Sequence, residues 1–170
     1  VTAWSIAHSI ERDNADIRAQ LHRAENLDQV LNLVKAGDFQ ESELLLTDAL
    51  ASYQEAKKLD PKWQPASTGV ARIRLKIAEM KFTDAMSAGF SMLTAKSYEK
   101  ARQAFANAQK VFPKSEEPAD GLLQIDLAER MDAIETHKST VAEFVQQEDW
   151  QNAVTEYEAV LELDGTLVFA

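Results

Sequence analysis

The residue types that carry out enzyme chemistry are few in this chain and widely spaced. The three histidines, His8, His22 and His137, lie outside any H-E-x-x-H or E-x-x-H spacing, so a zinc or di-iron site on one helix lacks its ligands. Cysteine is absent, which removes thiolate nucleophiles and sulfur-ligated metals. The five scattered glycines form no phosphate-binding loop. The sequence therefore predicts a protein that is not an enzyme and that uses no metal or other cofactor.

Charge is unevenly distributed along the chain. The net charge of −10 argues against nucleic acid as a partner, because phosphate binding requires a positive surface. The segment 57–114 nevertheless holds 12 Lys or Arg and 4 Asp or Glu, against 6 and 24 in the rest. Such a centre could steer an acidic partner, or it could complement neighbouring parts of the chain or a neighbouring copy. The candidate basic surface consists of Arg72, Arg74, Lys76 and Lys81.

The elements that position these residues are predicted to be helices only. Apolar residues recur at three-to-four spacing, no alternating β-branched run is present, and no apolar run approaches the roughly 20 residues of a membrane span. Asp60-Pro61 and Phe112-Pro113 end helices, because proline cannot continue one. We expect six helices, near residues 3–35, 40–59, 66–95, 97–111, 119–147 and 149–163.

A unit of 52 residues repeats within the chain. Pro61 precedes Pro113 by 52 residues, and Gly165 lies 52 residues further on. The same offset relates several glycine, aromatic and small residues, among them Gly69 and Gly121, Tyr53 and Phe105, Phe105 and Tyr157, and Ala101 and Ala153. An ordered set of this kind indicates a repeat protein built from helix pairs.

Two segments, 96–113 and 148–165, resemble the second half of a tetratricopeptide repeat. The family's aromatic, small and proline positions are filled by Tyr98, Ala101, Phe105, Ala108 and Pro113, and in the later copy by Trp150, Ala153, Tyr157, Val160 and Gly165. Gly37-Asp38-Phe39 resembles the family's turn between helices. The period departs from the family's 34 residues. We expect the extra residues to lengthen the first helix of the later pairs, whereas the first pair lengthens its second helix, between Phe39 and Pro61.

The resemblance implies antiparallel helix pairs stacked as an α-α superhelix, because each pair has an apolar face that it cannot bury alone. We expect residues 1–36 to form a long leading helix and residues 37–170 to form one continuous repeat domain. The chain begins with Val rather than Met and ends in the apolar GTLVFA, so we expect it to be part of a longer protein.

The family's peptide-binding positions lie on the inner face of the first helices. The matching residues here, which the resemblance implies as a protein-binding site, are Met86, Phe90, Leu93, Lys138, Val145 and Gln146. The first three would form an apolar strip suited to an amphipathic helix or an extended peptide. The alternative is that these residues pack against the lengthened neighbouring helix and belong to the core.

Two functions follow as hypotheses. The first is a scaffold that binds a partner protein or peptide on the concave face. An acidic partner is one form of this hypothesis. The alternative is an assembly module that forms a homo-oligomer through the repeats and the first helix, where Ile10, Ile17, Ala24 and Leu31 recur every seven residues. The compartment stays open between cytoplasm and periplasm, and attachment to a membrane anchor outside this chain is a further alternative.

Overall fold

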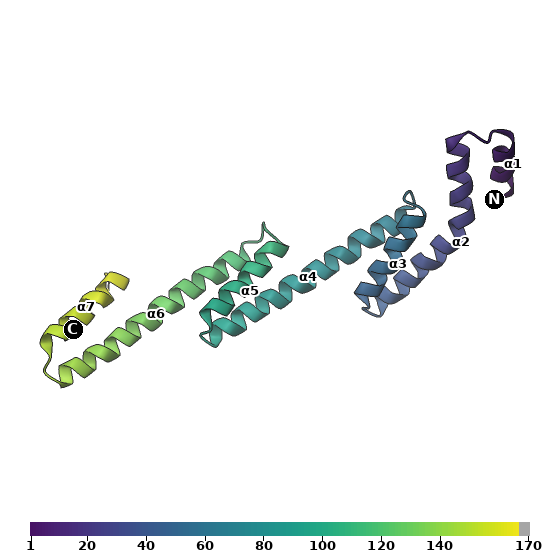
Figure 1. Cartoon of the computed structure of the whole chain (residues 1–170). Coiled ribbons are helices and arrows are strands. Elements are labelled where there is room, and N and C mark those ends of the chain that lie inside the picture. The colour runs from purple at the N-terminus through teal and green to yellow at the C-terminus, as the bar shows by residue number, and fades with distance from the viewer. Residues whose placement is uncertain (167–170) are drawn as a thin grey trace. The chain divides into compact units, whose positions relative to one another are not determined.

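The computed structural model describes residues 1–166, and their only regular elements are α-helices (Figure 1). The prediction of an all-α chain is therefore confirmed. Seven helices occur in the described range where six were expected. They are α1 (Thr2–Ile10), α2 (Ala15–Ser42), α3 (Leu46–Leu59), α4 (Gln64–Thr94), α5 (Tyr98–Val111), α6 (Glu117–Gln146) and α7 (Trp150–Leu163). The apolar residues 167–170, on which the expectation of further repeats partly rests, lie outside the described range.

The predicted helices 3–35 and 40–59 are wrong in their boundaries. The first is interrupted after Ile10, and Asn14 starts a new helix because its side-chain oxygen accepts hydrogen bonds from the backbone N–H groups of Asp16 and Ile17, at 3.0 and 3.2 Å. This interruption also breaks the seven-residue apolar seam between Ile10 and Ile17. Helix α2 then continues through Gly37, where a turn was predicted, and ends at Ser42.

Each long helix is joined to the next 14-residue helix by the same kind of turn. Leu44, Lys96 and Glu148, spaced 52 residues apart, have left-handed backbones with φ of 60°, 54° and 56°. In the first turn the N–H of Leu45 donates to the carbonyl of Gln40 at 2.8 Å, which is the Schellman pattern of a helix end. None of the three residues is a glycine, so each holds a disfavoured conformation.

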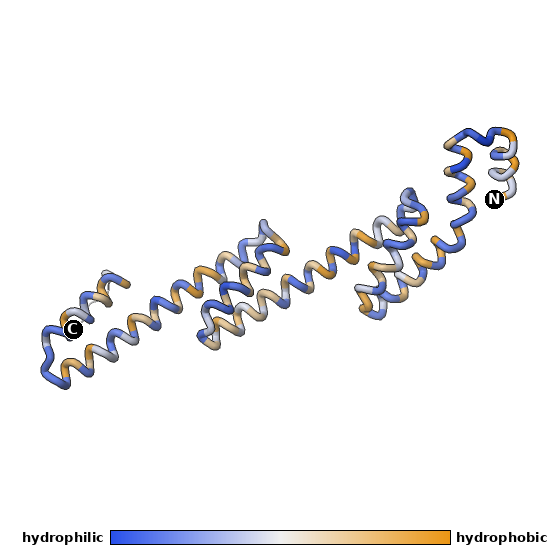
Figure 2. The backbone as a smooth tube through the Cα atoms, in the orientation of Figure 1, coloured by the Kyte–Doolittle hydropathy of each residue, from blue (hydrophilic) through white to orange (hydrophobic). Residues whose placement is uncertain are grey.

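The chain divides into two compact units, which are Val1–Met80 and Lys81–Ala170. The division falls inside α4, so residues 64–80 belong to the first unit and residues 81–94 to the second. The predicted division between residues 36 and 37 stays a prediction, and residue 37 lies within α2. Polar and apolar residues are interspersed along the long helices (Figure 2). Among residues 1–166, no helix is long and apolar enough to cross a membrane.

Tyr53 is the centre of the first unit's core. Its ring contacts Gly37 on α2 and Gly69 on α4, where an added Cβ would lie 2.9 and 2.5 Å from the ring. Glycine is needed at both positions because the ring occupies the space of a side chain. Gly37 therefore serves close packing and not a turn, which explains why α2 passes through it. The buried residues that pack in one cluster with Tyr53 are Leu46, Ala49, Val70 and Ile73. A separate buried cluster in the same unit consists of Val30, Ala56 and Ala66.

The second unit repeats this arrangement around Phe105. The ring contacts Gly89 on α4 and Gly121 on α6, with an added Cβ at 2.5 and 2.6 Å. Each of these three residues follows its counterpart in the first unit by 52 positions. The buried residues that pack with Phe105 are Met86, Ala101, Ala108 and Ile125. The period read from the sequence therefore corresponds to the same packing contacts in both units.

Candidate protein-binding groove

The helices α4 and α6 border a hollow near the start of α6 in the second unit. Phe105 packs between them, because Gly89 of α4 and Gly121 of α6 leave room for its ring. The hollow measures about 280 Å³, and its lining residues are Met86, Phe90, Glu117, Asp120 and Gln124. Met86 is buried, and the Phe90 ring packs edge-on against Phe105 at a centroid distance of 5.0 Å.

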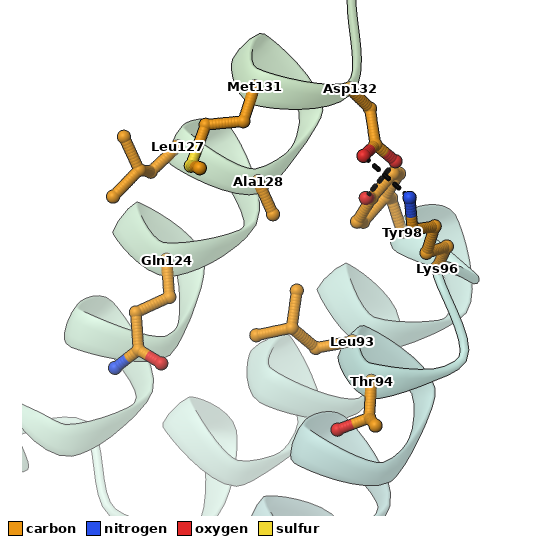
Figure 3. Close-up of a pocket in the computed structure, with 9 residues that line it drawn as sticks. All are labelled: Leu93, Thr94, Lys96, Tyr98, Gln124, Leu127, Ala128, Met131 and Asp132. Carbon is orange, nitrogen blue, oxygen red and sulfur yellow. Dashed lines mark hydrogen bonds and ion pairs between the residues drawn. The ribbon is translucent and has the colours of Figure 1, made fainter. Parts of the chain in front are cut away.

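A second hollow, of about 420 Å³, adjoins the first at Gln124 and extends toward the end of α4 (Figure 3). Its lining residues are Leu93, Thr94, Lys96, Tyr98, Gln124, Leu127, Ala128, Met131 and Asp132. Leu127 and Met131 are 55% and 61% exposed although both are large and apolar. We call the two hollows together the α4–α6 groove. Its wall is largely apolar and open to solvent.

A network of polar side chains closes one end of the α4–α6 groove. The Tyr98 hydroxyl donates to Asp132 at 2.6 Å, and the Lys96 ammonium group contacts the other oxygen of Asp132 at 2.7 Å (Figure 3). The bond to Asp132 raises the pKa of the Tyr98 hydroxyl to about 12, and the bond from Lys96 lowers the pKa of the Asp132 carboxyl. These bonds fix the turn after α4 relative to α6.

The opposite end of the α4–α6 groove is acidic. Glu117 and Asp120 lie in the first turn of α6, where carboxylates interact favourably with the helix dipole. Neither forms an ion pair with any residue in the range 1–166. Their charges border the apolar side chains of Met86 and Phe90.

The positions 52 residues earlier carry an ion-paired cluster in the first unit. Glu41 corresponds to Leu93, and it binds Arg72 at 2.6 Å and Lys76 at 2.7 Å. The hydrogen bond from Arg72, together with that from Lys76, lowers the pKa of the Glu41 carboxyl from 4.5 to about 2. Arg72 and Lys76 in turn precede Gln124 and Ala128 by the same offset. Charged residues in the first unit are therefore replaced by uncharged ones in the second.

The aromatic residue at the centre of each unit also has polar contacts in the first unit and apolar contacts in the second. The Tyr53 hydroxyl donates to Asp38 at 2.5 Å and accepts from Arg72 at 3.1 Å. Burial raises the pKa of that hydroxyl, and the bond to Asp38 raises it further. Phe90 corresponds to Asp38, and it meets Phe105 through ring contacts instead of a hydrogen bond.

The residues predicted to bind a partner divide into two groups. Met86, Phe90 and Leu93 come together in the α4–α6 groove. Lys138 and Val145 line a separate hollow of about 230 Å³ beside α7, and Gln146 is exposed at the end of α6. The structure thus brings half of the predicted set into one site.

The predicted basic surface is partly engaged within the chain. Arg72 and Lys76 both bind Glu41, while Arg74 is exposed on α4. Lys81 is also exposed and belongs to the second unit.

Sequence reasoning missed the exposed side of the groove. Leu123, Leu127 and Met131 continue a helical apolar stripe, but all three are exposed, whereas Ile125 is buried against Phe105. The signal that could have distinguished them is the 52-residue offset, because Ile125 corresponds to the buried Ile73 while Met131 corresponds to Glu79.

Several titratable side chains outside the groove pair with each other across neighbouring helices. His137 on α6 contacts Glu156 on α7 at 2.5 Å, and Arg102 on α5 binds Asp126 at 2.6 Å and also Glu129. Among residues 1–166, no three His, Cys, Asp or Glu side chains gather closely enough to hold a metal ion. The α4–α6 groove offers apolar contact from Leu93, Leu127 and Met131 and negative charge from Glu117 and Asp120. Comparison with models of protein families, with curated proteins and with solved structures gave no match for this chain.

Proposed function

We propose that this chain is a protein-interaction module and not an enzyme, and that its second unit binds an apolar segment of a partner protein in the α4–α6 groove. The observation that supports this most is the exposure of Leu127 and Met131 beside Leu93 in one hollow. Exposed apolar surface costs roughly 25 cal/mol per Å² relative to burial. A partner that covers these side chains would recover that free energy.

The comparison between the two units supports the same assignment. Five positions change from polar to less polar residues at the 52-residue offset: Asp38 to Phe90, Glu41 to Leu93, Tyr53 to Phe105, Arg72 to Gln124, and Lys76 to Ala128. In the first unit these side chains bind one another. In the second they leave an open apolar hollow. A coordinated exchange at one site favours a binding role over chance surface variation.

We further propose that the helix pairs are tetratricopeptide-like repeats that stack as an α-α superhelix. The support is the 52-residue period of the 14-residue helices, of the turns and of the glycine–aromatic contacts. In such an arrangement the α4–α6 groove belongs to the face formed by the first helix of each pair, where the family binds its peptides.

The residues that line the groove indicate which side chains a partner segment should have. Leu93, Leu127 and Met131 suit an amphipathic helix or an extended peptide with apolar side chains. Glu117 and Asp120 carry negative charge at one end, so a Lys or Arg on the partner would be favoured there. This differs from the acidic partner that the basic centre of the sequence suggested.

Capture of partners from the source cells tests the proposal. Leu127→Asp with Met131→Asp places two charges in the groove, and Leu75→Asp with Met80→Asp places two on equally exposed positions of the first unit, where Leu75 and Met80 are 53% and 55% exposed. We expect the first double variant to lose a partner that the wild type and the second variant both retain. Equal retention by both would exclude the groove.

Self-association is the second candidate, because α1 exposes large apolar residues. Trp4, Ile6 and Ile10 are all exposed on this helix, which has no buried residue. Light scattering over a range of concentrations distinguishes the two functions. A dimer that dissociates on Ile6→Asp with Ile10→Asp would favour assembly, whereas a monomer throughout would favour the binding module.

A further inference from the structure

A hollow of about 400 Å³ lies in the first unit, between α2 and the turn that joins α3 to α4. Its lining residues are Ala19, His22, Arg23, Lys58, Leu59, Asp60, Pro61 and Lys62. Three of these residues are Lys or Arg and one is Asp, so positive charge exceeds negative charge even with a neutral histidine. We call this site the basic hollow. It is a local positive surface on a chain whose net charge is −10.

A buried carboxylate forms part of the basic hollow. Asp60 is 4% exposed, and among residues 1–166 no other polar or charged residue is buried. Burial of a charge is costly unless the charge is paired. One oxygen of Asp60 accepts a hydrogen bond from the Arg23 Nε at 2.9 Å, and the other accepts from the backbone N–H of Lys62 at 3.0 Å. Asp60 therefore has a partner for each oxygen, and it holds the Arg23 side chain beside the hollow.

Arg23 keeps most of its donors for a ligand. Its Nε is used by Asp60, and one terminal nitrogen lies 3.4 Å from the side-chain oxygen of Gln20, which is longer than an ordinary hydrogen bond. The terminal nitrogens of a guanidinium form a planar fork that matches a carboxylate. Because the bond to Asp60 already orders the Arg23 side chain, little freedom is lost when the fork binds an anion.

Lys58 and Lys62, both from the basic segment 57–114, add two further cations to the hollow. Lys58 contacts Glu55 at 3.6 Å, but the two side chains are 77% and 48% exposed, which makes this a weak pair. The Lys62 ammonium group forms no ion pair with any residue in the range 1–166. Both ammonium groups can therefore bind an anion from outside the chain.

The pair of Arg23 and Asp60 is particular to this copy of the repeat. The counterpart of Asp60, 52 residues later, is Phe112, whose ring packs edge-on against Phe82 with centroids 5.3 Å apart. The counterpart of Arg23 is Leu75. The turn after α5 therefore has an aromatic contact where the turn after α3 has an ordered guanidinium.

We propose that the basic hollow binds an acidic peptide segment of a partner protein, in which a carboxylate side chain stands beside an apolar one. The carboxylate pairs with the terminal nitrogens of Arg23 and with Lys58 and Lys62. A hollow of this volume is larger than a carboxylate alone, so the apolar neighbour covers Leu59 and Pro61. The proposal does not depend on the α4–α6 groove, because the basic hollow belongs to the first unit.

A short peptide of alternating leucine and glutamate, labelled with an uncharged fluorophore, serves as the probe. Its fluorescence anisotropy is followed as the intact chain is added at low ionic strength. We expect saturable binding that weakens as salt is added, and binding about tenfold weaker for the peptide with glutamine in place of glutamate. Equal binding of the two peptides, or no binding, would overturn the proposal. Displacement of the peptide by an equal concentration of hexanoate would overturn it in favour of a small organic acid.

Paired variants of the chain locate the peptide. Lys58→Gln with Lys62→Gln removes two exposed charges, so it should preserve thermal unfolding and weaken binding about tenfold. Lys110→Gln with Lys114→Gln is the matched control, because these lysines are exposed and lie 52 residues later in the second unit. The control should bind the peptide as the wild type does. Equal weakening by both double variants would reduce the effect to net charge and overturn the proposal.

Arg23→Lys tests the guanidinium fork separately from its charge. The lysine keeps a cation beside Asp60 but lacks the planar fork, so we expect binding about fivefold weaker. The comparison is made at a temperature where circular dichroism shows the variant to be folded. Binding equal to that of the wild type would contradict the role of Arg23, and with it the proposed site.

Discussion

The Phe90 ring meets the Phe105 ring edge-on, with centroids 5.0 Å apart and planes at 76°. At the positions 52 residues earlier, the Asp38 carboxylate instead accepts a hydrogen bond from the Tyr53 hydroxyl at 2.5 Å. In both units, glycines occupy the two equivalent positions that contact the central ring. One packing scheme therefore supports a polar surface in the first unit and an apolar groove in the second.

This equivalence predicts that the polar pair can be built into the second unit. Phe90→Asp alone removes an aromatic contact, and Phe105→Tyr alone buries a hydroxyl beside an apolar ring. Together they should form the hydrogen bond of the first unit. We expect a coupling free energy of about 1 kcal/mol or more in a double-mutant cycle measured by urea unfolding. Strictly additive effects would mean that the two units do not share their geometry.

Glycine at position 121 is predicted to be required by Phe105. A Cβ there would lie 2.6 Å from the ring, so Gly121→Ala should destabilise the second unit by about 1–2 kcal/mol even though alanine favours helix by about 1 kcal/mol. The smaller side chain of Phe105→Leu should reduce the cost of Gly121→Ala in the double variant. Unfolding midpoints of the four proteins measure this, and a Gly121→Ala variant as stable as the wild type would contradict it.

The left-handed residue after α2 is predicted to be a point where stability can be gained. Leu44 has φ of 60° and is 78% exposed, so its side chain contributes little packing. Leu44→Gly should stabilise the chain by about 1 kcal/mol because glycine adopts this conformation without strain. Leu45→Gly, outside the left-handed region, is the matched control and should destabilise. Thermal unfolding of both variants decides the matter.

Stability of the first unit is predicted to depend on pH through Glu41. Its pKa in the folded chain is about 2, below the ordinary 4.5, so its stabilising contribution is complete above pH 4.5 and is lost as pH falls toward 2. Glu41→Gln should cost about 1–2 kcal/mol at neutral pH after allowance for solvent screening, with the difference shrinking below pH 4.5. Amide exchange in α3 measures it, and a difference independent of pH would contradict the assignment.

Much of the helical framework could be predicted because its signals are local. The stops at Pro61 and Pro113 and the glycine–aromatic matches placed the last four helices within two residues of their observed bounds. The region before Ser42 could not be predicted in this way. A glycine followed by Asp and an aromatic is typical of a turn, but Gly37 lies against Tyr53, which only tertiary contacts reveal.

The sequence predicted the residues that α4 contributes to the groove, but not those that α6 contributes. Met86, Phe90 and Leu93 were identified through the positions of a known repeat family, and they do line the groove. Leu127 and Met131 could not be assigned from periodicity, because α6 packs against α5 and also against α7. The buried side of such a helix changes along its length, so one apolar stripe contains both buried and exposed residues.

Site-specific crosslinking tests the binding groove most directly. The chain has no cysteine, so Leu127→Cys in the second unit and Leu75→Cys in the first each create a single attachment point for a photoreactive group. The two positions are 52 residues apart and almost equally exposed. We expect the captured partner to crosslink to residue 127 and not to residue 75. Crosslinking at residue 75 alone, or at both to the same extent, would contradict a binding site in the α4–α6 groove.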